Sequence, residues 1–372
     1  MILIVSIPAL STDFYRFLWD GELVASGINP YVYPPDHYFN NDLSAYLTEV
    51  YNLLSYTIYH SMYPPFTQLT GFLASLIGND SIPGGIVVLR IFVIGFDLLN
   101  IFIIQRLVKM FGLPGNRVLL YALNPLIILE LTGNLHHEVY LITFSLGAIY
   151  FLEKKRRISS AISLGFAVLS KLLPLIFLPL LFRKIGFKNS MIYCLVVGVV
   201  TLSGFAYFLD ESLSGLFSSG ALYFQKLEFN ASIYFLVREV GFWYKGYNII
   251  QTAGIWLGVI TAISIITYAA FYKPKTLFPE SFMWVWFIYV MFTTTLHPWY
   301  ITPIIAFSIF TRFRFAVVWS FLIFLTYAGY TVQGYSETYW IFFIEYLVVY
   351  GWLIFEMFSK ENQSSFTSKV LS

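Results

Sequence analysis

Long apolar stretches recur along most of the chain and are separated by short polar turns. A bilayer core about 30 Å thick is crossed by about 20 apolar residues of α-helix. The pattern therefore predicts an all-α integral membrane protein that crosses the bilayer several times. The predicted spans are residues 86–105, 117–134, 138–152, 191–209, 249–272, 280–296, 300–311, 315–332 and 338–358.

Residues 158–182 are also long enough for one span, but basic residues flank both ends, at 154–157 and at 183–188. Basic residues concentrate in cytoplasmic turns, so both ends belong on the same side. Pro174 disfavours a continuous helix because proline lacks the backbone N–H and its ring clashes with the preceding turn. We therefore predict a hairpin of two short helices that bends at SKLLP, Ser170 to Pro174.

The charged residues indicate which side of the membrane each turn occupies. With the hairpin accepted, alternate crossing brings most of the 22 Lys and Arg residues to one side. The positive-inside rule identifies that side as cytoplasmic. Most acidic residues, including Asp13, Asp20 and Glu138, then fall on the other side. The sequence thus predicts a multi-pass protein of the cell membrane whose polar chemistry lies on the extracytoplasmic face.

Residues 11–85 hold most of a large first extracytoplasmic loop in this topology. A loop of this length in a compact protein is usually functional or disordered, and its apolar content argues against disorder. Its segment 63–78 is too short to span and is predicted as a helix lying at the membrane interface. A second outer loop is predicted at 210–248. We expect one transmembrane domain over 1–358 and a polar cytoplasmic tail over 359–372.

The start of the chain is short for a membrane span. Ten residues precede Ser11, which is enough helix for about 15 Å, or half a bilayer. We expect either a first span shortened by a late start or a half-helix. A cleaved signal peptide fits poorly because no basic segment precedes the apolar residues.

The composition agrees with the membrane class. Of 372 residues, 58% are hydrophobic and 11% are charged, and the mean hydropathy is +0.72. The net charge of +2 is too small to indicate a nucleic acid partner or an acidic substrate. The single cysteine, Cys194, excludes an intramolecular disulfide.

The opening stretch STDFYRFLWDGELVASGINPYVYPP, Ser11 to Pro35, places charges among aromatic residues at the outer face. Asp13, at the mouth of a membrane cavity, is suited to a general base that removes a proton from an acceptor hydroxyl. Its structural alternative is a helix N-cap, because helical spacing follows it up to Gly27. Arg16 and Asp20 are candidate substrate-binding residues, with an i,i+4 ion pair between them as the structural alternative.

GNLHHEVY, Gly133 to Tyr140, places His136, His137 and Glu138 at an outer helix boundary. Two histidines and a carboxylate are metal-ligand types, but adjacent side chains on a helix diverge, so at most two of them face one ion. Contact with a polar headgroup or a sugar is the second interpretation. Solvation at the membrane interface is the third.

LHPWYITP, Leu296 to Pro303, places His297, Trp299 and Tyr300 on the same predicted side. A ring here is suited to stack on a sugar, and His297 is suited to hydrogen-bond a phosphate. An aromatic belt at the membrane boundary is the structural alternative.

Lys171 lies at the tip of the predicted hairpin, where a charge is costly unless it is paired. It is a candidate to meet a lipid phosphate, with snorkelling to an interface as the alternative. Arg90 and Arg238 are further candidates for that role. Asp97 and Glu130 are intramembrane acids, for which hydrogen bonding between helices is the alternative to a functional role.

These blocks together resemble a known family. The stretch from Ser11 to Pro35, followed by YPPFTQL, YALNPLIILELTGNLHHEVY, SKLLPLIFLPLL and HPWYITPI, is similar to the polyprenyl-phosphate-mannose-dependent mannosyltransferases of the glycosyltransferase C superfamily. Within that superfamily the mycobacterial phosphatidylinositol mannoside and lipomannan mannosyltransferases are the nearest in pattern. The blocks are scattered from Ser11 to Pro303, and the first of them is the most specific.

The resemblance implies a glycosyltransferase C-type helical bundle. It also implies an inverting transfer of a sugar, on the outer face, from a polyprenyl-phosphate donor to a lipid-linked, glycan or protein hydroxyl. Asp13 matches the acidic base of such enzymes, His297 would lie near the donor phosphate, and Lys171 is a further phosphate candidate by position. The implied partners are the donor, the acceptor and membrane lipids, with no nucleic acid.

The sequence departs from the family pattern in two places. Glu138 stands where related chains often show Asp, and the first span is short. The second departure matters because that helix would anchor Asp13. A DxD motif is absent, so no cofactor and no divalent metal are implied.

Two other classes fit a polytopic chain with intramembrane acids. A secondary transporter, or a flippase for lipid-linked substrates, usually shows paired repeats and polar sites at the bilayer midplane. Here the polar clusters lie at one face and no repeat is visible. A membrane scaffold without catalysis is the third class, in which Asp13, Lys171 and His297 would be replaceable.

Overall fold

The computed structural model describes residues 2–39, 43–209, 226–272, 277–331, 334–336 and 338–359. The chain divides into two compact units, of which the first comprises residues 1–100, 129–175 and 191–222 and the second the remainder. Most of the predicted tail at 359–372 and the first part of the predicted loop at 210–248 lie outside the described residues. The predicted domain division stays a prediction.

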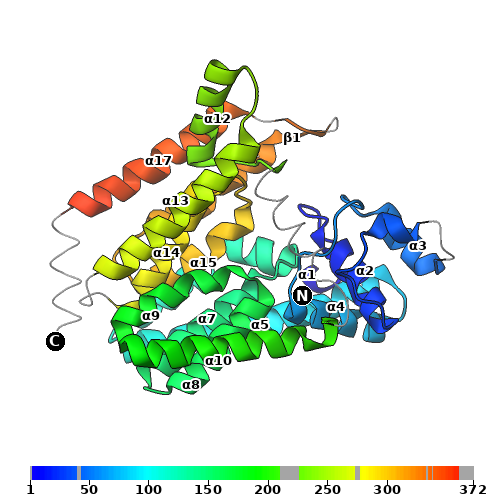
Figure 1. The fold of residues 1–372 in the computed structure, drawn as a ribbon, viewed down its shortest axis with the longest axis horizontal. Helices are drawn as coiled ribbons and strands as arrows, with labels where there is room; N and C mark the ends of the chain where they lie inside the picture. The colour runs from blue at the N-terminus through cyan, green and yellow to red at the C-terminus, as the bar shows by residue number, and fades with distance from the viewer. Residues whose placement is uncertain are drawn as a thin grey trace. The chain divides into compact units, whose positions relative to one another are not determined.

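The first unit is built from helices and turns (Figure 1). Its elements are α1 (Ile2–Val5), α2 (Asp13–Ala25), the 3-10 turn η1 (Pro35–Tyr38), α3 (Ala45–Asn52), α4 (Pro65–Gly78), the first part of α5 (Ile82–Met110), most of the π-helix η3 (Ile127–Gly133), α7 (Glu138–Glu153), α8 (Arg157–Ser170), most of α10 (Phe187–Phe205) and the 3-10 turn η5 (Ala206–Phe208). The 3-10 turn η4 (Leu173–Phe177) follows α8.

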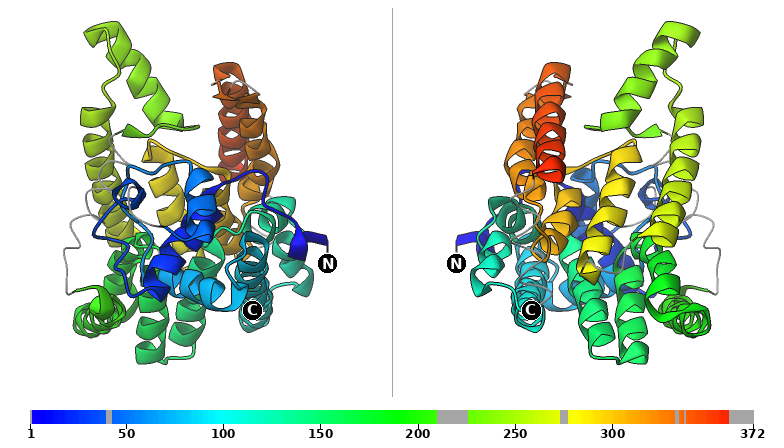
Figure 2. Two further views of the ribbon diagram at one scale, coloured as in Figure 1. Left: turned by 90° about the vertical axis from the view of Figure 1, so that its right-hand side faces the viewer. Right: turned by 90° about the vertical axis from the view of Figure 1, so that its left-hand side faces the viewer.

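The second unit is also helical (Figure 2). Its elements are the end of α5, η2 (Gly115–Val118), α6 (Leu119–Ala122), α9 (Leu178–Ile185), α12 (Ser232–Lys245), α13 (Ile250–Phe271), α14 (Phe278–Phe292), η6 (Pro298–Ile301), α15 (Thr302–Ser308), α16 (Phe315–Leu322), η7 (Ile323–Gly329), strands β1 (Tyr330–Thr331) and β2 (Gly334–Tyr335), and α17 (Tyr339–Phe358). The two strands pair antiparallel in a small hairpin.

The predicted all-α class is confirmed, with this small hairpin as the only sheet among the described residues. Within the same residues, four helices are long and apolar enough to cross a bilayer. They are α5, α10 with its 3-10 extension to Phe208, α13 and α17. These helices bear out the membrane class that the composition indicated.

The prediction of one continuous span over 117–134 is wrong. Helix α6 ends at Ala122, and the π-helix η3 begins only at Ile127. Pro125 lies between them and cannot donate a backbone hydrogen bond. The Asn124 side chain fills the gap, because its Oδ1 accepts from the backbone N–H of Leu126 at 2.9 Å. The predicted spans at 300–311 and 315–332 are likewise shorter α-helices, of which the second continues as 3-10 turns.

Helices α2 and α4 touch through glycine. A Cβ added at Gly21 would lie 2.2 Å from the backbone carbon of Gly71, and one added at Gly71 would lie 2.4 Å from the carbonyl oxygen of Phe17. Only residues without a side chain allow two helix backbones to approach this closely. The contact fixes the middle of α2, which begins at Asp13, relative to α4.

Helices α7 and α8 form a tight antiparallel pair. The Ser163 hydroxyl donates to the carbonyl of Phe144 at 2.7 Å, and the Ser160 hydroxyl donates to that of Ala148 at 2.7 Å. Lys155 turns the chain between them with φ +60°. Since α7 begins at Glu138 and α8 ends at Ser170, the pair brings both of these ends to the same side of the first unit.

The predicted break at SKLLP is confirmed. Helix α8 ends at Ser170, Lys171 has an extended backbone with φ −159° and ψ 135°, and α9 begins at Leu178. Pro174 stands four residues after Ser170, so its ring would clash with the Ser170 carbonyl in a continuing helix. That carbonyl instead accepts a hydrogen bond from the Thr67 hydroxyl at 3.3 Å.

Candidate active site

Glu138 and Lys171 form an ion pair in the first unit. The Lys171 ammonium donates to the Glu138 carboxylate. Glu138 is the first residue of α7, and Lys171 follows the last residue of α8. The Glu138 side chain is 3% exposed, whereas that of Lys171 is 27% exposed. Because Lys171 keeps part of its surface open, its charge is available to a bound anion.

Asp13 lies close enough to this pair to sense both charges. It is the first helical residue of α2, after Thr12, so its interpretation as the N-cap itself is wrong by one residue. The pKa of Asp13 is raised to about 6 by loss of solvation and, second, by the negative charge of Glu138. The positive charge of Lys171 and a hydrogen bond from Tyr63 oppose the rise in pKa. The Asp13 side chain stays partly exposed.

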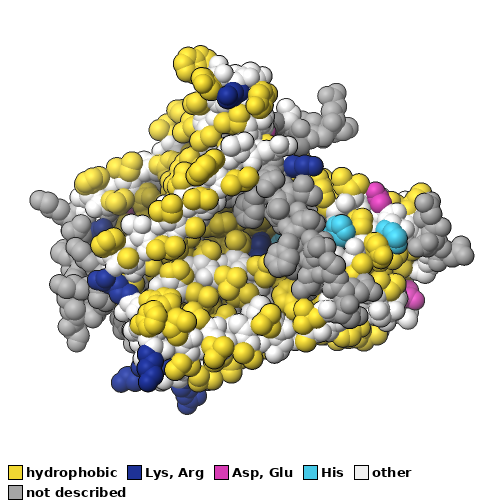
Figure 3. Space-filling model, in the orientation of Figure 1, with side chains coloured by type: hydrophobic (Ala, Val, Ile, Leu, Met, Phe, Trp, Pro, Cys, Tyr) yellow, Lys and Arg dark blue, Asp and Glu magenta, His cyan; other side chains and the backbone are white. Residues whose placement is uncertain are grey.

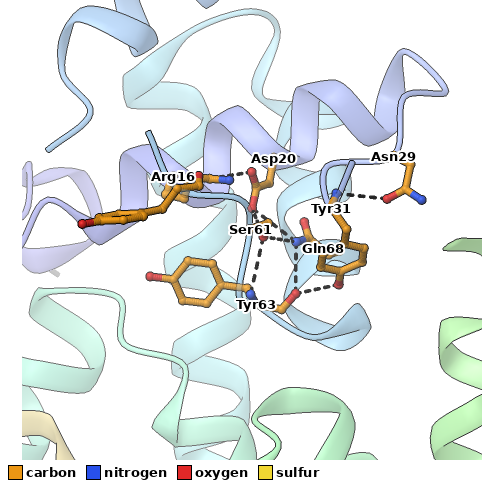
Figure 4. A network of polar contacts seen from close by, with 8 residues as sticks. Arg16, Asp20, Asn29, Tyr31, Ser61, Tyr63 and Gln68 are labelled. Atoms are coloured by element: carbon orange, nitrogen blue, oxygen red, sulfur yellow. Dashed lines mark hydrogen bonds and ion pairs between the residues drawn. The ribbon is translucent and has the colours of Figure 1, made fainter. Parts of the chain in front are cut away.

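Tyr63 is held in place by a network of polar side chains (Figure 4). The Tyr63 carbonyl accepts from the Tyr31 hydroxyl at 2.6 Å and from Gln68 Nε2 at 3.1 Å. Gln68 Nε2 also donates to Ser61 Oγ at 2.8 Å. Ser61 donates in turn to Asp20 at 2.5 Å. The network therefore ties residues 61–63 to α2 and α4.

Arg16 and Asp20 belong to the same network, and their geometry matches the structural alternative. Arg16 Nε donates to Asp20 Oδ1 at 2.7 Å, and Arg16 donates to the Tyr59 carbonyl at 2.9 Å (Figure 4). Asp20 is 1% exposed. A carboxylate so enclosed and so fully bonded is suited to hold the loop that carries Tyr63 rather than to contact a substrate.

His137 packs beside these residues. Its ring stacks on Phe17, with centroids 3.8 Å apart and planes inclined by 21°. Its Nδ1 lies 3.0 Å from the Thr67 hydroxyl. Because that hydroxyl donates to the Ser170 carbonyl, it accepts from Nδ1–H, which leaves Nε2 with the lone pair. Burial, and second the charge of Lys171, lower the pKa of His137 to about 3, so the ring is neutral.

His136 turns away from His137, as expected for adjacent side chains. Its Nε2 lies 3.5 Å from Glu130 Oε2, which also accepts from Asn134 at 3.1 Å. Leu135 before it has φ +65°, which redirects the chain between η3 and α7. Among the residues that the structure describes, no group of three or more His, Cys, Asp and Glu side chains is arranged to hold a metal ion.

The Arg90 side chain holds the turn at the end of η3 through hydrogen bonds. Its guanidinium donates to the carbonyls of Thr132 and Gly133, each at 3.0 Å, and to those of Ile4 and Ser6. The side chain is fully buried. Arg90 therefore joins the start of the chain to the end of η3, which is a structural role rather than the phosphate contact considered from the sequence.

His297, Trp299 and Tyr300 lie in the second unit. His297 precedes η6 and stacks on Trp299, with centroids 4.4 Å apart and planes inclined by 7°. Phe229 lies 4.6 Å from the His297 ring. Trp299 and Tyr300 are 8% and 6% exposed. The three residues thus form a packed aromatic cluster in which His297 is the most accessible member.

Sequence reasoning missed Tyr63, Thr67 and Gln68 as members of the site. All three lie in or near YPPFTQL, where a hydroxyl and an amide follow a proline pair at the start of α4. The sequence showed these polar residues but could not show which residues they contact, because Asp13, Asp20 and His137 come from other segments.

The first unit therefore combines a partly exposed acid of raised pKa with an ion pair between the buried Glu138 and the partly exposed Lys171. Charged groups that perturb one another in this way mark a candidate functional site. Residues 2–184 match the family model of the alpha-(1->6)-mannopyranosyltransferase, N-terminal domain. The chain is also 28% identical over 181 residues to alpha-(1->6)-mannopyranosyltransferase A of Mycobacterium tuberculosis (strain ATCC 25618 / H37Rv).

That alignment covers 48% of this chain and 34% of the relative, so the chain spans about one third of the length of the curated protein it matches. Of the two matches, that to the family model covers the part of the chain that contains Asp13, Glu138 and Lys171. They confirm the resemblance to mycobacterial mannosyltransferases that the sequence motifs indicated.

Proposed function

We propose that the chain is a membrane mannosyltransferase that moves a sugar from a polyprenyl-phosphate donor to a hydroxyl of a lipid-linked, glycan or protein acceptor. The similarity to alpha-(1->6)-mannopyranosyltransferases supports mannose as the sugar. The reaction takes place on the extracytoplasmic face with inversion at the sugar carbon. Asp13 is the general base.

The environment of Asp13 is the observation that carries this proposal. A general base works best when its pKa lies near the working pH, because it is then ionised yet still basic. Ordinary aspartates are too acidic for this, but the pKa of Asp13 is raised to about 6. The hydrogen bond from Tyr63 orients the carboxylate while it waits for the acceptor.

The proposed step is a single displacement. The acceptor oxygen forms a bond to the anomeric carbon as its proton passes to Asp13, and the bond from that carbon to the phosphate oxygen breaks. Polyprenyl phosphate leaves with the electron pair. Lys171 lies where its ammonium can offset the negative charge that develops on the leaving phosphate, an effect that is large in a poorly solvated site.

Glu138 and His137 have supporting roles in this proposal. Glu138 holds Lys171 through the ion pair and keeps the Asp13 carboxylate basic through its own charge. His137 is neutral and offers Nε2 to a sugar hydroxyl. His297, with Trp299 and Tyr300 beside it, remains a candidate for contact with the donor phosphate. A metal ion is not needed for any of these steps.

The membrane gives the physical reason for a helical scaffold. The polyprenyl tail is as apolar as lipid and stays among the helices, whereas the phosphate-sugar head needs polar partners above them. The aromatic residues of the loop before α4 exclude water and so limit hydrolysis of the activated sugar.

The test is transfer by the purified full chain from radiolabelled polyprenyl-phosphate mannose to total lipid acceptors. We expect Asp13→Asn to lower the rate by about 10²–10⁴-fold, the usual contribution of a general base. Asp36→Asn is the matched control, because Asp36 is an exposed acid of the same region that accepts from the Tyr51 hydroxyl. Unchanged transfer by Asp13→Asn would remove the assigned base.

The transporter or flippase alternative gives a different result in the same preparation. Vesicles containing the chain would then move the labelled lipid or sugar across the bilayer without forming a new glycosidic product. Such an outcome, with the mannose recovered only as donor or free sugar, would replace the proposed function.

A further inference from the structure

Helix α12 carries its apolar side chains on the outside of the second unit. Leu236, Val240, Trp243 and the following Tyr247 are 71%, 61%, 89% and 61% exposed. The first three, spaced by four and three residues, lie on one face of α12, and Tyr247 follows two residues after the helix ends. Figure 3 shows hydrophobic side chains along this segment, at the top of the view. We call these four residues the α12 stripe.

The opposite face of α12 is polar and is bonded to the protein. Arg238 donates to Glu228 at 2.9 Å and is 3% exposed. The Tyr234 hydroxyl donates to Glu228 at 2.6 Å, and Asn248 Nδ2 donates to the same carboxylate at 3.0 Å. A helix with this face in water would expose a contiguous apolar stripe, which surface helices normally turn toward the protein core. The stripe therefore faces something other than water.

The start of α12 packs against α13, because Tyr234 lies in one core cluster with Ala253 and Leu257 of α13. Helix α13 begins at Ile250, only four residues after α12 ends, and is one of the four helices apolar enough to span. Four residues reach at most about 14 Å. Figure 2 shows α12 rising from that end of α13.

We propose that α12 lies along the membrane surface at the point where α13 enters the bilayer, with the α12 stripe inserted among lipid headgroups. The α12 stripe then contacts the same lipid bilayer that covers the exposed apolar face of α13. Trp243 and Tyr247 are of the residue types that prefer this boundary. An interfacial amphipathic helix of this kind buries its apolar face about 5–10 Å deep. The inference is independent of sugar transfer.

Fluorescence quenching of single labels tests the depth of α12. In a Cys194→Ser background of the full chain, a polarity-sensitive NBD label is attached to Leu236→Cys or Trp243→Cys. Lys245→Cys is the control on the same helix, because Lys245 is exposed and lies on the face opposite Leu236 and Trp243. Ile263→Cys, on an exposed apolar position of α13, is the control for a deep site. The vesicles contain phosphatidylcholine and phosphatidylglycerol.

Nitroxide lipids quench from either the headgroup or the middle of the acyl chain. We expect labels at 236 and 243 to be quenched about twofold more by the headgroup nitroxide than by the acyl-chain nitroxide, as for an interfacial helix. The label at 263 should show the reverse order, which also verifies that the chain is folded and inserted. The label at 245 should be quenched less than either stripe position.

Three results would overturn the inference. Labels at 236 and 243 quenched no more than the label at 245 would place the stripe in water. An order of quenching like that at 263 would place it in the acyl region. Self-quenching that grows with the protein-to-lipid ratio would identify a second copy of the chain as the occupant. None of these results depends on whether the protein transfers a sugar.

Discussion

The pH dependence of sugar transfer gives a direct test of the electrostatics around Asp13. The base must be ionised, so kcat/KM should rise with pH through the Asp13 pKa of about 6 and then level off. Glu138 raises that pKa and Lys171 lowers it. Neutralising the two residues in turn, with Glu138→Gln and Lys171→Met, should therefore move the midpoint of the profile in opposite directions.

The size of the shift follows from the rise already present. Burial, and second the charge of Glu138, raise the pKa of Asp13 from the ordinary value of 3.8 to about 6. One pKa unit corresponds to about 1.4 kcal/mol, a plausible interaction between charges several Å apart near a protein surface. We expect Glu138→Gln to lower the midpoint by about one unit and Lys171→Met to raise it by a similar amount.

The assay is the pH profile of kcat/KM between pH 4 and pH 9 for the wild type and both variants. At pH 5 a fall of one unit raises the ionised fraction of Asp13 about fivefold. The plateau of kcat/KM should also be lower for the Lys171 variant, because it lacks the charge assigned to the leaving phosphate. The midpoint of its pH profile can be determined independently of the height of that plateau. Midpoints that stay together, or that move in the same direction, would refute the assignment of Asp13 as the titrating base.

Two further predictions concern the scaffold of the first unit. Gly71→Ala introduces a Cβ 2.4 Å from a backbone oxygen of α2. It should therefore lower the free energy of unfolding by about 1–3 kcal/mol, together with the melting temperature in detergent. Gly258→Ala is the control because the space around Gly258 is open, and equal melting temperatures of the two variants would contradict the close contact. Asp20→Asn leaves Arg16 without its ion-pair partner and should lower the free energy of unfolding by about 3 kcal/mol. Asp36→Asn at the surface should leave the melting temperature unchanged. A lower melting temperature for both variants would argue against a specific role for Asp20.

Several features of the fold could be predicted from local sequence. The break after Ser170 follows from Pro174, and the end of α2 near Gly27 follows from a glycine that adopts φ +74°. These features depend on steric effects within a few residues of the chain. Pro125 gave the same kind of signal, yet the apolar run around it was interpreted as one span because hydropathy ignores hydrogen bonding.

The candidate site was predictable only in part. Asp13, Glu138 and Lys171 could be named because charged residues are rare in so apolar a chain. That Glu138 and Lys171 form an ion pair could not be known, since 33 residues separate them. The roles of Asp20 and Arg90 could not be predicted either, because each depends on hydrogen-bond partners in distant segments of the chain.

The sequence by itself determined the class of the protein and the residue types available for chemistry. The hydropathy and charge of a side chain set its preference for water or for lipid, and this preference does not depend on where the residue lies in the fold. The tertiary structure decided which charges meet: it brought Asp13 into the field of Glu138 and Lys171 and turned His136 away from His137. Interaction between charges depends on distance and burial, and only the folded chain sets these.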